Sequence, residues 1–151
     1  RTSGPATLAV QRKRLTFDPG KVHIKLYVML KAIIAVGLGS CTGGILRYLV
    51  SKLSDSVNDG RFPLGTLAVN LAGCLIIGIL SALAEKGGIA NGFFTTGLLG
   101  GFTTFSTFMN ESFQMVRDER YAILLAYMAA SIFGGFLFVF AGYALARNLF
   151  D

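Results

Sequence analysis

Tryptophan is absent from this chain, histidine occurs once and cysteine only twice. The histidine, His23, lies near the amino terminus, and the cysteines, Cys41 and Cys74, form no CxxC or Cys/His cluster. Transition metals are held by clusters of such side chains, so a site of that kind has no ligands here. A Ser-His-Asp arrangement lacks a usable base for the same reason. We therefore do not expect an enzyme.

Charged residues are missing from long stretches of the chain. Residues 64–84, 87–110 and 121–146 contain no Asp, Glu, Lys or Arg, and residues 29–50 contain only Lys31 and Arg47. Each stretch is about as long as the roughly 20 helical residues that a bilayer core requires. We therefore predict an all-α integral membrane protein with four transmembrane helices joined by short connections.

The positive charge is concentrated at the amino terminus. Nearly all of the net charge of +6 falls in residues 1–28, whose cations are Arg1, Arg12, Lys13, Arg14, Lys21 and Lys25. Because the rest of the chain has no basic patch, we expect no nucleic-acid partner. Residues 1–28 show no helical or strand period. We expect a non-native or disordered basic tail, or an Arg-rich targeting segment, ahead of a membrane domain at residues 29–151.

The other cations do not fix the orientation of the helices in the membrane. Outside the tail, one side of the expected bundle has Lys31, Lys86 and Arg147, and the opposite side has Lys52, Arg61, Arg117 and Arg120. Because the cations on the two sides are nearly balanced, the positive-inside rule does not favour one orientation over the other. Insertion in both orientations is therefore possible.

Small residues are spaced so that helices can approach closely. The pairs with this spacing are Gly39 and Gly43, Gly97 and Gly101, and Ala130 and Gly134. Four helices with short connections leave little room for an aqueous path within one copy. Together with the undecided orientation, this favours an antiparallel homodimer with its symmetry axis in the membrane plane.

Three polar side chains fall within the expected helices. Arg47 lies near the end of the first, where it is either a snorkelling anchor or functional. Asn70 lies too deep in the second helix to snorkel, so its amide either binds a ligand or bonds another helix. Glu111, near the end of the third, either forms an interfacial ion pair or takes part in conduction.

The third stretch contains an unusual polar segment. Gly100 and Gly101 are adjacent and weaken a helix by roughly 1 kcal/mol each. We predict a break in the third helix between Gly100 and Thr103, because broken backbone at membrane depth is tolerated where it lines a cavity or binds something. Carbonyls released at Gly100 and Thr103 would suit a hard cation such as sodium.

The residues after the predicted break alternate rings with hydroxyls. Phe105 and Phe108 share one helix face, and so do Thr104 and Thr107. Two phenylalanines at this spacing are usually a core stripe, but the hydroxyls between them do not suit a face that touches only lipid. Hydroxyls, the amide of Asn70 and the electropositive ring edges of phenylalanine can together replace the water of a small anion. The residues alone therefore indicate a small-anion pathway.

Three segments resemble the CrcB/Fluc family of fluoride channels, in order along the chain from about residue 29. They are GSCTGGILRY at 39–48, PLGTLAVNLAG at 63–73 and GGFTTFSTF at 100–108. The resemblance implies an antiparallel, dual-topology homodimer with two pores. Such a dimer would export fluoride passively across a bacterial plasma membrane and so lower cytoplasmic fluoride.

The resemblance also implies roles for particular residues. The fluoride pore would be lined by the phenylalanine pair Phe105 and Phe108, the donor Asn70, and the hydroxyls of Thr104, Ser106, Thr107, Tyr127 and Ser131. Arg47 and Glu111 would be supporting charges. The carbonyls of Gly100 and Thr103 would hold a structural sodium ion at the dimer axis.

Two other classes of membrane protein are alternatives. A small multidrug-type, proton-coupled exporter also has four helices and dual topology, but it needs a membrane-embedded acid in its first helix, where this chain has Arg47 and no acid. An assembly subunit without transport activity would explain the glycines but not the pattern of rings and hydroxyls.

Overall fold

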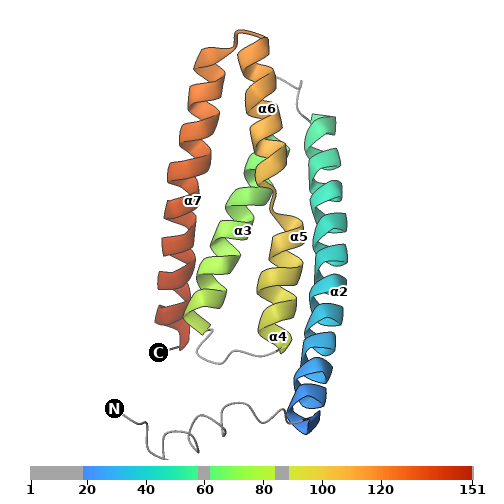
Figure 1. Ribbon diagram of the computed structural model, residues 1–151. Coiled ribbons are helices and arrows are strands. Elements are labelled where there is room, and N and C mark those ends of the chain that lie inside the picture. The colour runs from blue at the N-terminus through green and yellow to red at the C-terminus, as the bar shows by residue number, and fades with distance from the viewer. Residues whose placement is uncertain (1–18, 58–61, 84–88, 151) are drawn as a thin grey trace, which may run out of the picture. The chain divides into compact units, whose positions relative to one another are not determined.

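The computed structural model describes residues 19–57, 62–83 and 89–150, and every regular element within them is helical (Figure 1). The elements are α2 (Pro19–Val57), α3 (Leu64–Leu83), α4 (Ile89–Asn91), the π-helix η1 (Gly92–Leu99), α5 (Gly100–Phe102), α6 (Phe105–Arg117) and α7 (Tyr121–Phe150). Three of them, α2, α3 and α7, are long and apolar enough to cross a membrane. The prediction of an all-α membrane protein is therefore confirmed.

The first helix is longer than the sequence suggested. α2 begins at Pro19 and continues to Val57, beyond both ends of the predicted 29–50. The prediction that the tail has no regular structure is wrong for residues 19–28; residues 1–18 lie outside the described residues, as does the expected connection at 85–88. The chain divides into two compact units, Arg1–Lys31 and Ala32–Asp151, and the boundary between them falls within α2. The packing described below is that of the second unit.

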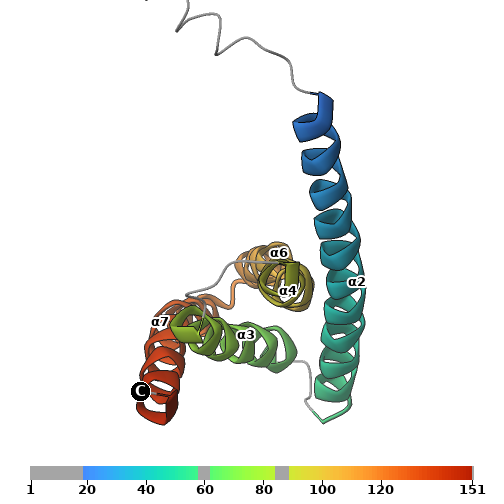
Figure 2. The ribbon, with the colours of Figure 1, turned by 90° about the horizontal axis from the view of Figure 1, so that it is seen from below.

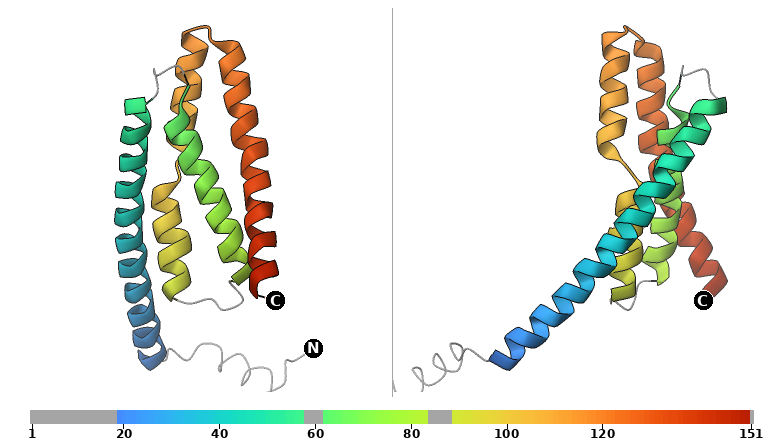
Figure 3. Two further views of the ribbon diagram at one scale, coloured as in Figure 1. Left: turned by 180° about the vertical axis from the view of Figure 1, so that it is seen from behind. Right: turned by 90° about the vertical axis from the view of Figure 1, so that its right-hand side faces the viewer.

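Helices α3 and α7 pack side by side (Figures 1 and 3). A Cβ built on Gly78 of α3 would collide with the carbonyl of Val139, and one built on Gly142 of α7 would collide with that of Leu75. Because neither glycine has a side chain, the two backbones can touch, and such close packing is a main source of helix association in lipid. This close packing positions the polar side chains that α3 and α7 carry.

A second close contact joins α2 to the helical segment that contains η1. A Cβ on Gly39 or Gly43 of α2 would meet the backbone of residues 93–102, and one on Gly101 would meet the backbone of Ser40. Gly97 likewise lies against Gly39. The predicted close approach at the pairs Gly39/Gly43 and Gly97/Gly101 is therefore confirmed, as a contact within one copy.

The third predicted helix is interrupted, but not by its glycine pair. Gly100 and Gly101 are helical, and the backbone becomes extended only at Thr103 and Thr104. Gly101 instead allows α2 to approach, because a Cβ built on it would collide with the backbone of Ser40. Nothing lies within 4 Å of a Cβ built on Gly100. The parts before and after the interruption, η1–α5 and α6, lie end to end in Figure 1 and overlap when seen from below in Figure 2.

Candidate ion pathway

Two threonines close one half of the interrupted helix and open the other. The N–H and the Oγ1 of Thr103 both donate to the carbonyl of Leu99, at 2.9 Å each, and so end α5. Thr104, with φ −150° and ψ 115°, caps α6, because its Oγ1 accepts the N–H of Thr107 at 3.2 Å. β-Branched side chains tolerate extended backbone well. The adjacent threonines thus supply both the conformation and the caps of the break.

Asn70 of α3 holds the break from the side. Its Oδ1 accepts the N–H of Thr104 at 2.9 Å, and its Nδ2 donates to the carbonyl of Thr104 at 3.1 Å. The side-chain amide therefore replaces the acceptor that a continuous helix would have given the N–H of Thr104, and it adds a second donor to a carbonyl that already accepts the first hydrogen bond of α6. Of the two readings of Asn70 left open by the sequence, the bond to another helix is present. Its second N–H has no acceptor among the described residues, so it can still donate to a ligand.

The break releases carbonyl groups from the helical ladder, those of Gly100 and Thr103 among them. In a continuous α-helix the N–H of Thr104 would bond the carbonyl of Gly100, and the N–H of Thr107 would bond that of Thr103. Here these amides bond Asn70 and Thr104 Oγ1 instead. Gly100 and Thr103, the two residues proposed from the sequence as cation ligands, are therefore among the residues around the break whose carbonyls lose their helical donors.

Three hydroxyl groups gather at the start of α6. Thr104 Oγ1 lies 3.0 Å from Thr107 Oγ1 and 3.3 Å from Ser106 Oγ. The Thr104 side chain is buried. Three of the five hydroxyls assigned to the pathway are thus in contact through Thr104, and we call Thr104, Ser106 and Thr107 the hydroxyl cluster.

An open groove with a volume of about 470 Å³ lies on one side of this cluster. Its lining includes Asn70, Thr104, Phe105, Phe108 and Ser131, together with Gly100 and Thr103. Ser131 Oγ is buried and has no hydrogen-bond partner among the described residues. A buried hydroxyl normally has a partner, so this one is available to a ligand or to a second chain.

The two phenylalanines differ sharply in exposure. Phe108 is 6% exposed, whereas Phe105 is 74% exposed in the single chain. Their ring centroids are 5.9 Å apart, and Phe108 also packs on Tyr127 with centroids 5.0 Å apart. Tyr127 is fully buried and meets Phe62 edge-on at 5.5 Å. The predicted ring pair is present, and Tyr127 supports it from behind.

Glu111 joins three helices through hydroxyl groups. Its Oε1 accepts from Thr66 Oγ1 of α3 at 2.7 Å, and its Oε2 accepts from the Tyr127 hydroxyl of α7 at 2.7 Å. Both oxygens are therefore engaged, and neither pairs with a basic residue among the described ones. Of the two interpretations of Glu111 left open by the sequence, the ion pair is not present among the described residues. The tertiary packing brings donors from two other helices to it, which sequence spacing could not reveal.

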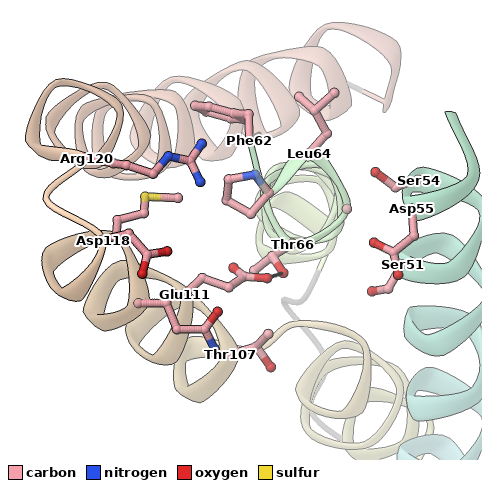
Figure 4. A pocket seen from close by; sticks show the side chains of 14 residues that line it. Ser51, Ser54, Asp55, Phe62, Leu64, Thr66, Thr107, Glu111, Asp118 and Arg120 are labelled. Carbon is pink, nitrogen blue, oxygen red and sulfur yellow. Dashed lines mark hydrogen bonds between the residues drawn. The ribbon is translucent and has the colours of Figure 1, made fainter. Parts of the chain in front are cut away.

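A second hollow of about 290 Å³ lies on the other side of the hydroxyl cluster (Figure 4). Thr66, Thr107 and Glu111 line it, and Ser51 and Asp55 of α2 face them across it. Because Thr107 lines this hollow and Thr104 lines the groove, the hydroxyl contact between them connects the two spaces. The arrangement gives a file of hydroxyl groups between two hollows.

Arg47 is the second charged residue that was expected to support the pathway. Arg47 is half-buried, lines neither hollow and has no hydrogen bond or ion pair with another described residue. Thr66 and Phe62 were not predicted. Thr66 could have been found, because it precedes Asn70 by one helical turn and is likewise polar in an apolar run. Phe62 gave no signal, because it lies outside the predicted helices.

The fold and the site together define a multi-pass membrane protein, in which polar groups gather at a helix break between two hollows. Residues 34–143 match the model of a protein family that is described as "CrcB-like protein, Camphor Resistance (CrcB)". The chain belongs to this family.

Several curated relatives are similar over most of their length. A fluoride-specific ion channel FluC from Azobacteroides pseudotrichonymphae is 42% identical over 79% of this chain and 98% of its own length. The FluC protein of Flavobacterium psychrophilum is 35% identical over 80% of this chain and 100% of its own length. That of Aquifex aeolicus is 41% identical over 78% of this chain and 98% of its own length.

Proposed function

We propose that this protein is a fluoride-selective channel through which fluoride leaves the cytoplasm passively. The observation that carries the proposal is the hydroxyl cluster at the helix break, which connects a hollow on one side to a ring-lined groove on the other. The names of the relatives, each a fluoride-specific ion channel, support the choice of ion.

The chemistry of the lining suits a small anion that loses its water. Dehydrating an ion in a narrow space costs tens of kcal/mol unless other donors take the place of water. Here the donors are the hydroxyl cluster, the second N–H of Asn70, the hydroxyl of Ser131 and the ring edges of the phenylalanines. No fixed cation lines the groove within the described chain. An ion is therefore held weakly enough to leave, which conduction requires.

The working unit in this proposal is an antiparallel homodimer of two four-helix copies, with two pores. Phe105 and Gly100 line an open groove and are themselves exposed in the single chain. A pore that excludes water cannot be open along one side, so a second copy must cover the groove. The near balance of cations outside the tail supports insertion in both orientations.

A structural sodium ion fits the carbonyls that the break releases. Gly100 and Thr103 contribute neutral oxygen ligands, which suit a hard cation, and each copy would supply one pair. When bound, the ion would neutralise these carbonyl dipoles and tie the copies together. Asn70 and Thr104 contribute by holding the amides away, so that the carbonyls stay available.

Ion efflux from proteoliposomes tests the proposal. Purified protein should release fluoride quickly and chloride hardly at all, without needing a proton gradient. Transport of aromatic cations, or efflux coupled to pH, would instead identify a small multidrug-type exporter. Equal fluoride and chloride efflux would refute the selectivity.

A substitution in the ring pair tests the pathway itself. Phe108→Ile should abolish most fluoride flux while the dimer survives on a sizing column, because the ring edge that faces the anion is lost. Phe133→Ile is the matched control, since Phe133 is exposed on α7 and lines neither hollow. Wild-type flux in Phe108→Ile would remove the ring pair from the mechanism.

A further inference from the structure

The amino-terminal part of α2 extends beyond what a bilayer core requires. At about 1.5 Å per residue, the 39 residues of α2 span roughly 58 Å. The hydrocarbon core is only about 30 Å thick. Between Lys31 and Lys52 the only charged residue is Arg47, so the segment Pro19–Lys31 belongs at the level of the lipid headgroups or outside them. We call it the basic helical segment.

The charge of this segment is unbalanced. It contains Lys21, Lys25 and Lys31 and no acidic residue, and Lys25 and Lys31 are exposed. Cations elsewhere at helix ends have acids close in sequence. Lys52 is three residues from Asp55, and Arg117 is followed by Asp118 and Glu119. The basic helical segment therefore attracts anions more strongly than those cations do.

The uncharged side chains of the segment favour lipid over a soluble polyanion. Val22, Ile24 and Leu26 are exposed, and none packs on another part of the described chain strongly enough to be buried. Tyr27 is also exposed, with Lys31 Nζ 4.3 Å from the centre of its ring. Tyrosine and lysine are typical of the membrane–water interface, where a ring rests among acyl chains and an ammonium group meets phosphates.

We infer that the basic helical segment binds anionic phospholipid headgroups through Lys25 and Lys31, with its apolar side chains among the acyl chains. Juxtamembrane lysines attract anionic lipids by about 1 kcal/mol each near the surface. None of the described residues of this segment lines either hollow, and the inference does not depend on the transported ion.

The test compares phosphatidylglycerol with phosphatidylcholine as a lipid neighbour of the full chain. Spin-labelled forms of both lipids are added to vesicles containing the protein, and the motionally restricted fraction of each is measured. Phosphatidylglycerol should be preferred by the wild type. The preference should fall by roughly threefold or more in Lys25→Gln/Lys31→Gln and decrease at high salt, because exposed charges are screened.

Two further variants separate this surface from charge in general and from misfolding. Lys52→Gln/Arg117→Gln removes the same amount of charge elsewhere and should keep the preference. Lys25→Arg/Lys31→Arg keeps the charge and should also keep it. An unchanged preference in Lys25→Gln/Lys31→Gln, or an equal loss in the control, would overturn the inference. So would a complete loss of the preference when a soluble polyanion is added at low salt, because the segment would then bind that polyanion in place of lipid.

Discussion

Replacing Asn70 with alanine should destabilise the protein and free the backbone at the helix break. The substitution removes two hydrogen bonds, of 2.9 and 3.1 Å, and leaves the N–H of Thr104 without a partner. A buried group left unpaired costs about 1–3 kcal/mol, whereas side-chain hydrogen bonds within membranes average about 0.6 kcal/mol and reach about 1.7 kcal/mol. We expect a loss of about 2 kcal/mol.

Equilibrium unfolding in mixed micelles measures this loss, and hydrogen exchange at the Thr104 amide locates it. The amide should be protected in the wild type and exchange much faster in Asn70→Ala. Ser81→Ala is the control, because Ser81 lies on the same helix and makes only a local, exposed hydrogen bond to Ile77. If Asn70→Ala were no more destabilising than Ser81→Ala, and the Thr104 amide stayed protected, Asn70 would not hold the break.

Two more substitutions test the packing around the pathway. Tyr127→Phe removes a donor from Glu111 and should cost about 1.5–3 kcal/mol of unfolding free energy, because the bond is to a carboxylate; the exposed Tyr121→Phe should change it little. A cost as small as that of Tyr121→Phe would show that this bond contributes nothing. Gly43→Ala should cost about 1–3 kcal/mol in the same assay, since its Cβ would collide with the Leu98 carbonyl. Gly44→Ala meets nothing and should be neutral or stabilising, so equal effects would contradict the close contact.

Much of the candidate site could be predicted from the sequence because polar residues are conspicuous in an apolar run. Asn70, the hydroxyl cluster and the ring pair all stand out where lipid offers no hydrogen bonds. Their positions along the chain also bring several of them to one groove, as expected. The break at Thr103 and Thr104 lies at the carboxyl end of the predicted range, because helix propensity had pointed to the glycines at its start. Those glycines serve packing, and the threonines supply the caps.

Composition and the length of uncharged runs determined by themselves that this chain is helical and lies in a membrane, because a bilayer sets one length for every span and excludes charge from it. Which partner each polar group takes was decided only by the tertiary structure. Asn70 bonds Thr104, and Glu111 bonds Thr66 and Tyr127, across distances in sequence that no helical period encodes. A hydrogen bond depends on atoms meeting within about 3 Å, and only the packing of one helix on another brings such atoms together.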